Sequence, residues 1–358
     1  MTQDRATRLS ELTSAAELDA LLVTSLINVR YLTGYTGSNG LALVGPELRR
    51  FVTDFRYVEQ AAAEVEPSFE RSRAPVDLLE GLMAALPGGA IRLGFEEEHL
   101  SVARYGFLRE QLEDRVELVA TAGLVESLRA VKDGAEIAAV RAAAVIADAA
   151  LGRILERGLL GRTEREVATS LEHDMVLAGA RRPSFDSIVA AGPHGARPHA
   201  EARDVEIRRG ELVVIDWGAE LDGYHSDCTR TIAAGEPGAE ARERYELVLR
   251  AQLAGLEAVR AQRPTAEVDA AARQIIEAAG HGEDFGHGLG HGVGLEIHEA
   301  PALRGRSSEQ LQAGNVVTVE PGVYLRGRFG IRIEDLVVVT EGPPEILTSV
   351  PKELVVTD

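Results

Sequence analysis

The feature that most constrains the fold of this chain is a set of acidic residues in strongly apolar, strand-like runs. Asp216 ends the run LVVI, Asp227 follows one hairpin later, Glu320 closes VVTV, and Glu334 interrupts IRIEDLVVV. Burying a carboxylate is costly unless a positive charge or a metal ion compensates it. A single acidic residue at a strand end is more often simply solvated. Four of them, close to a histidine-rich segment, instead indicate one shared and compensated site.

Side-chain alternation indicates which of these residues point the same way. Because successive side chains of a strand face opposite sides, Arg332 and Glu334 are expected on one face. By the same rule Asp227 and Thr229 point together, whereas Cys228 points away from them. Cys228 is the only cysteine, so the chain can form no intrachain disulfide. We expect it in the core rather than in the role of a nucleophile.

The segment 281–299, HGEDFGHGLGHGVGLEIHE, holds four histidines and six glycines. His287 and His291 are four residues apart, but the glycines disfavour a helix and the zinc-binding pattern HExxH is absent. The glycines also lack the GxGxxG spacing of a dinucleotide-binding turn. A glycine-rich backbone can instead approach a crowded site closely. We therefore interpret this segment as a source of ligands.

Together the acids and one histidine form a candidate metal site made of Asp216, Asp227, His291, Glu320 and Glu334. Four carboxylates are too much negative charge for one ion and favour two divalent cations that share bridging carboxylates. Ligation by oxygen, with one nitrogen and no thiolate, suits Mn²⁺ or Co²⁺ as well as Zn²⁺. Metal-assisted hydrolysis is the reaction class that such a site predicts.

The composition excludes several classes of binding partner and predicts the cellular compartment. The net charge of −19, from 57 acidic and 38 basic residues, opposes binding to nucleic acid and to anionic membranes. A single cysteine, no secretory signal and no apolar run of about 20 residues predict a cytoplasmic protein. The only lysines are Lys132 and Lys352, and neither follows a glycine, which excludes a P-loop. So few lysines also disfavour a pyridoxal Schiff base.

The order of the apolar segments predicts two domains. The first third alternates strand-like runs, such as LALVG and IRLGFE, with helical stretches such as DLLEGLMAAL, which is typical of an α/β domain. A long helical run begins near residue 136, and Thr163 with Glu166 forms a capping box before the next helix. We place the boundary within 121–134, giving an α/β domain at 1–125 and an α+β domain at 126–358. The sheet of the second domain is expected to be mostly antiparallel.

Several sequence blocks resemble the signature motifs of the proline-specific metallopeptidases. They are IDWGAELDGYHSDCTRT, GHGLGHGVGLEIHE, TVEPGVY and GIRIED, with FDSIVAAGPHGARPHA resembling an upstream histidine block. NVRYLTGYTG and TDFRYVEQA resemble the creatinase-like N-terminal domain of the same family. This family comprises aminopeptidase P and Xaa-Pro dipeptidase (prolidase), and is related to methionine aminopeptidase and creatinase. The resemblance implies a creatinase-like α/β domain, a "pita-bread" α+β catalytic domain, and usually a homodimer.

The resemblance also implies how the five candidate ligands divide the metal ions. Asp216 would bind one ion, and His291 with Glu320 the other. Asp227 and Glu334 would bridge the two. Glu320 would in addition shuttle the proton from the attacking water to the proline nitrogen.

Further residues receive roles from the same resemblance. His199, His287 and His298 would line the site and steady the scissile carbonyl, and His298 would also contact the substrate. Arg332 and Tyr224 would orient the ligands without binding metal.

The activity implied by the resemblance is hydrolysis of the Xaa-Pro bond in dipeptides or short peptides, with two divalent ions and Mn²⁺ the first choice. Arg306 resembles the arginine that prolidases use on the substrate's C-terminal carboxylate. With the compact N-terminal domain, it favours an Xaa-Pro dipeptidase over an aminopeptidase P acting on Xaa-Pro-Yaa peptides. A non-catalytic binding protein and a creatinase-type amidinohydrolase remain alternatives, although both typically lack ligands that are all present here.

Overall fold

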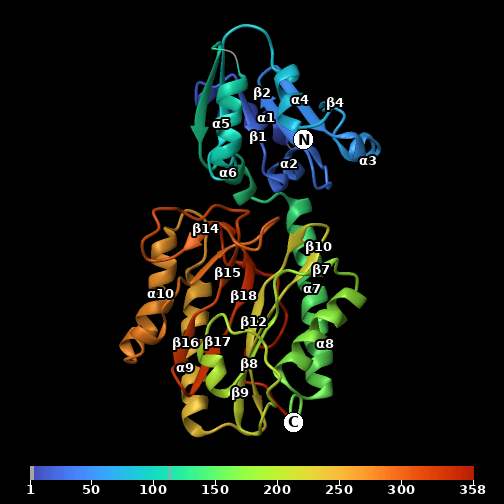
Figure 1. Cartoon of the computed structure of the whole chain (residues 1–358). Coiled ribbons are helices and arrows are strands. Elements are labelled where there is room, and N and C mark those ends of the chain that lie inside the picture. The colour runs from blue at the N-terminus through green and yellow to red at the C-terminus, as the bar shows by residue number, and fades with distance from the viewer. Residues whose placement is uncertain (1–3, 113) are drawn as a thin grey trace. The chain divides into compact units, whose positions relative to one another are not determined.

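The computed structural model divides into two compact units, Met1–Arg129 and Ala130–Asp358. It describes residues 4–112 and 114–358 (Figure 1). The sequence placed the division after residue 125. No helix in the described part of the chain is long and apolar enough to cross a membrane.

The first unit is built on a mixed six-stranded sheet with the order β4-β3-β2-β1-β5-β6. Its central strand β1 (Ala20–Val23) pairs antiparallel with β2 (Leu41–Gly45) and parallel with β5 (Ile91–Glu96). The outer strands are β3 (Leu48–Thr53), β4 (Glu70–Arg73) and β6 (Val116–Thr121). The helices are α1 (Arg5–Ala15), α2 (Leu26–Thr33), α3 (Val58–Glu64), α4 (Leu78–Ala85), α5 (Val102–Gln111) and α6 (Leu124–Ala130). The predicted α/β class of this unit is confirmed.

The second unit places its strands between two pairs of helices (Figure 1). The pair α7 (Gly134–Arg157) and α8 (Glu164–Leu177) shares an apolar core with one sheet. The pair α9 (Ala239–Ala258) and α10 (Thr265–Ala278) shares a second core with another. The capping box predicted for Thr163 and Glu166 is present at the start of α8.

Nearly all strands of the second unit are antiparallel, as the sequence predicted. The first sheet has the order β20-β12-β9-β8, and the second β14-β13-β15-β18-β19. The bounds in the first sheet are β8 (Ile188–Ala191), β9 (Glu211–Trp217), β12 (Cys228–Ala234) and β20 (Val356–Thr357), which pairs parallel with β12. Those in the second are β13 (Gly290–Gly292), β14 (Glu299–Leu303), β15 (Val316–Val319), β18 (Asp335–Val338) and β19 (Glu345–Ile346). Smaller pairings use β7 (Arg182–Pro183), β10 (Ala219–Leu221), β11 (Tyr224–His225), β16 (Gly322–Leu325) and β17 (Phe329–Arg332).

The run IRIEDLVVV, which the sequence suggested as one strand, is divided between two sheets. Its first part ends β17, which pairs with β16. Its second part forms β18, which pairs with β15. Ile333 and Glu334 fall between the two strands. Glu334 is therefore placed where the chain passes from one ladder to another.

Candidate metal centre

The five predicted ligands all come from strands or from residues next to them. Asp216 is near the end of β9 and Asp227 directly precedes β12, its antiparallel partner. His291 is the central residue of β13, and Glu320 directly follows β15. Glu334 lies in the gap between β17 and β18. These strands belong to different sheets, and the Glu334 amide links them by donating to the Thr229 carbonyl of β12 at 3.1 Å, which brings residues more than 100 positions apart together.

The structure brings all five side chains together. Carboxylate oxygens of Asp216, Asp227 and Glu334 lie within 4.8 Å of one another. His291 Nε2 is 3.5 Å from an Asp227 oxygen and 3.3 Å from a Glu320 oxygen. These side chains line a cavity of about 780 Å³. The cavity is large enough for a short peptide, since ligand sites typically span about 300–1,000 Å³.

The imidazole of His291 is oriented as a metal ligand would be. Its Nδ1 lies 3.0 Å from the Gly292 carbonyl, which can only accept, so Nδ1 carries the proton. In the neutral ring, Nε2 then presents its lone pair to the carboxylates. A second hydrogen bond of this kind is how proteins fix the tautomer of a ligating histidine.

The cluster is short of positive charge. Burial, followed by repulsion from neighbouring carboxylates, holds the pKa values of Asp227 and Glu334 well above their ordinary range. One oxygen of Asp216 and one of Glu334 are buried without a hydrogen-bond partner among the described residues. Glu320 differs in the metal-free protein: burial raises its pKa, but the hydrogen bond and charge of a protonated His291 outweigh burial and lower it to about 2. Acids crowded in this way, with unpartnered oxygens, fit divalent cations.

Arg332 and Thr229 hold the carboxylates in place. The Arg332 guanidinium donates to Asp216 Oδ2 at 2.5 Å and to the Thr229 hydroxyl at 2.9 Å. That hydroxyl donates in turn to Glu334 Oε2 at 2.7 Å. Arg332 and Glu334 therefore reach the same group, which confirms the shared face expected from strand alternation. Cys228 points away into the core, and burial raises the pKa of its thiol far above the ordinary range.

The histidines predicted to surround the ligands line the same cavity, and they are His199, His287 and His298. His287 donates from Nδ1 to the Gly288 carbonyl at 2.8 Å, so its Nε2 accepts from the Tyr324 hydroxyl at 3.0 Å. The ring of His298 lies against that of His291, with centroids 4.3 Å apart. Burial lowers the pKa values of His287 and His298 and so favours their neutral forms at neutral pH.

Two residues named from the resemblance lie elsewhere. The Tyr224 hydroxyl donates to Glu136 Oε1 at 2.9 Å, and Tyr224 is not among the residues lining the cavity. Arg306 does not line the cavity either, whereas Arg304 does. The two arginines are neighbours in PALRGRSSEQL, where the resemblance needs a gap, so the sequence could not decide between them. Tyr324 was missed because nothing in EPGVY marks its hydroxyl as a partner of His287.

The glycines on either side of His291 allow the backbone of β13 to lie close to the neighbouring strands. A Cβ atom on Gly290 would lie 2.0 Å from the Thr318 carbonyl oxygen, and one on Gly292 2.3 Å from that of Ala300. Real side chains do not tolerate such distances. The glycines thus allow β13 to fit between its neighbours, and this places His291 against Glu320.

A buried ionic cluster holds the loop that carries His199. Glu164, the first residue of α8, has no exposed surface. Its carboxylate accepts from the Ala191 amide at 2.9 Å and from Arg203 Nε and Nη2 at 3.0 Å, and lies 2.9 Å from His194 Nδ1. His194 and Arg203 are on either side of His199 in the chain, so Glu164 ties down both ends of the loop.

Replacing Glu164 with glutamine is expected to lower the free energy of unfolding by about 1–3 kcal/mol at pH 7. Burial raises the pKa of Glu164, but Arg203, the Ala191 amide and His194 outweigh burial and lower it. A folded-state pKa below the unfolded value stabilises the protein at high pH, and this contribution is lost as the pH falls through the folded pKa. Urea unfolding should therefore show a difference between the two proteins that shrinks below about pH 4. A difference that stayed constant down to the lowest pH at which both remain folded would contradict the ionic role.

Comparisons with known proteins agree with this arrangement. Residues 138–341 match metallopeptidase family M24, and residues 5–131 match the creatinase/prolidase N-terminal domain. The chain is 36% identical to the Xaa-Pro dipeptidase of Pyrococcus horikoshii, over 98% of this chain and 99% of that protein.

Two solved structures are similar over nearly their whole length. One is an Xaa-Pro dipeptidase from Bacillus anthracis, with a TM-score of 0.95 and 41% identity, covering 98% of this chain and 99% of that one. The other is an X-Pro aminopeptidase from Thermotoga maritima, with a TM-score of 0.90 and 36% identity, covering 99% and 100%.

Proposed function

Because the chain belongs to metallopeptidase family M24 and carries a creatinase/prolidase N-terminal domain, we propose that it hydrolyses the bond between an N-terminal residue and proline. The architecture expected from the sequence, a creatinase-like α/β domain followed by a pita-bread α+β domain, is confirmed.

The observation that carries the proposal is the convergence of four carboxylates, two buried and two largely buried, and one imidazole on the same cavity. In the predicted assignment Asp216 would hold one ion, His291 with Glu320 would hold the other, and Asp227 and Glu334 would contact both. Two bound divalent ions would polarise the peptide carbonyl and lower the pKa of water. Asp216 and Glu334, each with one buried oxygen that has no hydrogen-bond partner among the described residues, would be available to hold such ions.

The remaining groups of the cavity suit peptide hydrolysis. We assign to Glu320, which lies beside His291 in the cavity, the role of taking a proton from water and passing it to the proline nitrogen. His298, held neutral by burial, is assigned to donate a hydrogen bond to the scissile carbonyl as charge develops on its oxygen. His287, whose single ring proton is given to the Gly288 carbonyl, instead lines the cavity and accepts from the Tyr324 hydroxyl. His199 completes this wall of the cavity.

Within this activity we favour an Xaa-Pro dipeptidase, with aminopeptidase P as the alternative. Both activities are found among structures of similar likeness to this chain, so the choice depends on how the substrate's C-terminal end is recognised. Arg304 lines the cavity and can pair with a free carboxylate on proline. In the proposal Arg304 takes the part that the resemblance suggested for Arg306.

Replacing Arg304 with alanine is expected to raise KM for Ala-Pro by about 10–100-fold, since a charge-assisted hydrogen bond contributes about 1.5–3 kcal/mol. Arg306→Ala is the matched control and should leave KM for Ala-Pro unchanged. The tripeptide Ala-Pro-Ala, whose carboxylate lies one residue further on, should be affected less by Arg304→Ala. An equal loss with both substrates, or a larger loss in Arg306→Ala, would reject the assignment.

The function itself is tested with the metal-stripped protein after addition of Mn²⁺, Co²⁺ or Zn²⁺. Substrates are Ala-Pro, Ala-Pro-Ala and the proline-free control Ala-Ala. Hydrolysis of Ala-Pro well above Ala-Pro-Ala supports the dipeptidase, and the reverse order supports aminopeptidase P. Metal binding without hydrolysis of any Xaa-Pro peptide would instead favour a non-catalytic binding protein.

Other features of the proposal remain predictions from the sequence. They are the presence of two ions, the preference for Mn²⁺ over Co²⁺ and Zn²⁺, assembly as a homodimer, and a cytoplasmic location. Proline-containing peptides, rather than nucleic acid or membranes, are the partners that we propose, because the net charge is −19.

A further inference from the structure

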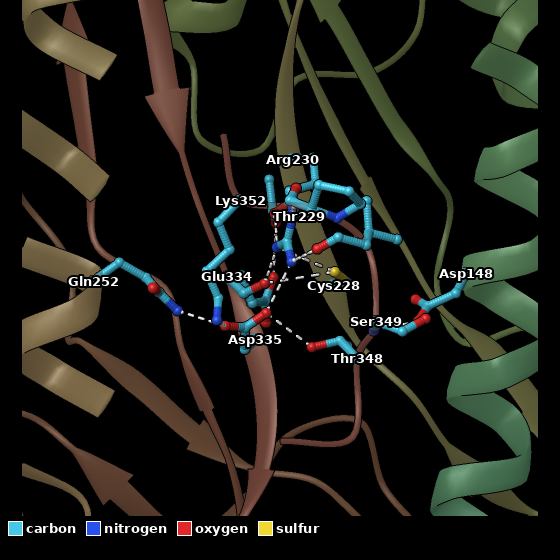
Figure 2. A network of polar contacts seen from close by, with 12 residues as sticks. Asp148, Cys228, Thr229, Arg230, Gln252, Glu334, Asp335, Thr348, Ser349 and Lys352 are labelled. Atoms are coloured by element: carbon cyan, nitrogen blue, oxygen red, sulfur yellow. Dashed lines mark hydrogen bonds and ion pairs between the residues drawn. The ribbon is translucent and has the colours of Figure 1, made fainter. Parts of the chain in front are cut away.

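The residue after the proposed ligand Glu334 is a second buried acid, Asp335, which does not line the cavity and whose polar contacts Figure 2 shows. Its two oxygens receive four polar contacts of 2.8–2.9 Å, two on each oxygen. The donors are Arg230 Nη2, Thr348 Oγ1, Gln252 Nε2 and Lys352 Nζ. This saturates the acceptor sites of a carboxylate. Burial raises the pKa of Asp335, but the charges of Arg230 and Lys352 outweigh burial and hold it below its ordinary range.

Arg230 connects Asp335 to the backbone of Glu334. Its side chain is 1% exposed. One terminal nitrogen, Nη1, donates both to the Glu334 carbonyl and to the Thr229 carbonyl, the latter at 2.9 Å. The Glu334 amide donates back to the same Thr229 carbonyl at 3.1 Å. Because Glu334 lies in the gap between β17 and β18, the guanidinium supplies a donor where no regular strand continues.

A short segment near the C-terminus closes this network from outside. We call residues 348–352 the C-terminal strap. Arg230 donates to its Val350 and Pro351 carbonyls at 2.6 and 2.9 Å, and Lys352 provides the ion pair to Asp335. The strap is fixed at both ends: the Ser349 hydroxyl donates to Asp148 of α7 at 2.7 Å, and Tyr245 of α9 donates to the Lys352 carbonyl at 2.7 Å.

This network is independent of the substrate cavity. None of Arg230, Asp335 and the strap residues is among the residues that line it. The strap also lies beyond residues 138–341, the part that matches family M24. Arg230 connects the network to the site through the backbone carbonyls of Glu334 and Thr229.

The two lysines of the chain are used in the same manner. Lys352 pairs with the acid that follows Glu334, and Lys132 Nζ lies 2.6 Å from an oxygen of Glu299, the acid that follows His298. All other basic side chains are arginines. A lysine ammonium is a compact, strongly hydrated charge, so burying Lys132 and partly burying Lys352 both require specific partners.

We propose that Asp335, Arg230 and the C-terminal strap position Glu334 for metal binding. The inference rests on the proposed function in one respect, that Glu334 is a ligand. With its amide and carbonyl held by Thr229 and Arg230, and its carboxylate by the Thr229 hydroxyl, Glu334 is ordered before an ion arrives. Metal binding then costs less free energy, because the Glu334 side chain is already ordered, and the affinity for the ion is higher. A buried ion pair with no such role would affect stability only.

The decisive variant is Lys352→Met, with Lys352→Arg as its conservative counterpart. Isothermal titration of the metal-stripped full-length proteins with Mn²⁺ measures Kd without any substrate. We expect Lys352→Met to raise Kd by about 10–100-fold, the size seen when groups behind a ligand are removed. Lys352→Arg should keep an affinity close to that of the original protein.

The matched control is Asp174→Asn. Asp174 is also buried and pairs with arginine, with Arg157 Nη2 at 2.8 Å, but it joins α7 to α8 away from the ligands. It should lower the free energy of unfolding without changing Kd. Thr348→Val is a milder second variant that serves if Lys352→Met does not fold. It removes one neutral donor from Asp335, and we expect a smaller rise of Kd.

The outcomes separate the inference from the function. An unchanged Kd in Lys352→Met and in Thr348→Val, or an equal rise of Kd in Asp174→Asn, would overturn the positioning role while leaving the peptidase intact. Failure of the original protein to bind Mn²⁺, Co²⁺ or Zn²⁺ would overturn the metal centre and the positioning role together. A rise of Kd that is confined to the strap variants supports the inference, even if no peptide is hydrolysed.

Discussion

Replacing Asp227 with asparagine is expected to abolish peptide hydrolysis and, in the metal-free protein, to increase stability. Asp227 is proposed to bridge the two ions, so its loss removes a contact to each. Metal assistance contributes several kcal/mol to transition-state stabilisation, and kcat/KM should fall by about 10³-fold or more. The measurement is steady-state hydrolysis of Ala-Pro in excess Mn²⁺.

The gain in stability follows from repulsion within the cluster. Oxygens of Asp227, Asp216 and Glu334 lie within 4.8 Å of one another. Two like charges about 4 Å apart repel by about 4 kcal/mol at an effective dielectric constant of about 20, part of which proton uptake relieves. The pKa of Asp227, raised far above its ordinary value by burial and by Glu334, has the sign expected for such repulsion. A neutral amide removes it, and urea unfolding in EDTA should show a gain of at least about 1 kcal/mol.

Metal should reverse the order of stability of the two proteins. An ion at about 100 times its Kd stabilises the folded protein by about 2.7 kcal/mol, and the variant should gain much less. Asp174→Asn is the control, because it should lose stability with and without Mn²⁺. A loss of stability for Asp227→Asn in EDTA would mean that the carboxylates do not repel one another as the geometry requires.

The strands with a strong apolar pattern could be predicted from the sequence, whereas an exposed strand at the edge of a sheet could not. LALVG and IRLGFE form β2 and β5, both in the middle of the first sheet. β4, with the sequence ERSR, was missed because it is an exposed edge strand whose side chains carry no apolar alternation. The division of IRIEDLVVV between two sheets was also missed, since it depends on partners that are distant in the chain.

The candidate site shows the same limit. Alternation along β12 was enough to place Cys228 in the core, because a strand alone sets that direction. Arg332 and Glu334 were also expected together and both contact Thr229, although β17 ends at Arg332 and Glu334 follows in the gap before β18. Which arginine of PALRGRSSEQL faces the cavity depends on how the chain turns after β14. The sequence did not single out Arg230 or Lys352, because their pairing with Asp335 depends on how the C-terminal strap folds over that residue.

Replacing Arg332 with leucine is expected to have the opposite effect on the metal-free protein to that of Asp227→Asn. The guanidinium is buried and donates to Asp216, Thr229 and the Tyr324 hydroxyl. Without it the carboxylates keep their mutual repulsion and lose their nearest permanent cation. Removing one partner of a buried ion pair costs about 3–5 kcal/mol, so urea unfolding in EDTA should show a loss of that size.

A double-variant cycle separates charge from packing in this loss. If Arg332 acts by offsetting the crowded acids, then Arg332→Leu should cost less in the Asp227→Asn background, where one negative charge is already absent. Saturating Mn²⁺ should also recover part of the stability, because the ions supply the missing positive charge. If the two changes are instead additive in EDTA and Mn²⁺ recovers nothing, Arg332 stabilises the fold by packing alone. The four carboxylates would then not form the electrostatic unit on which a two-ion centre depends.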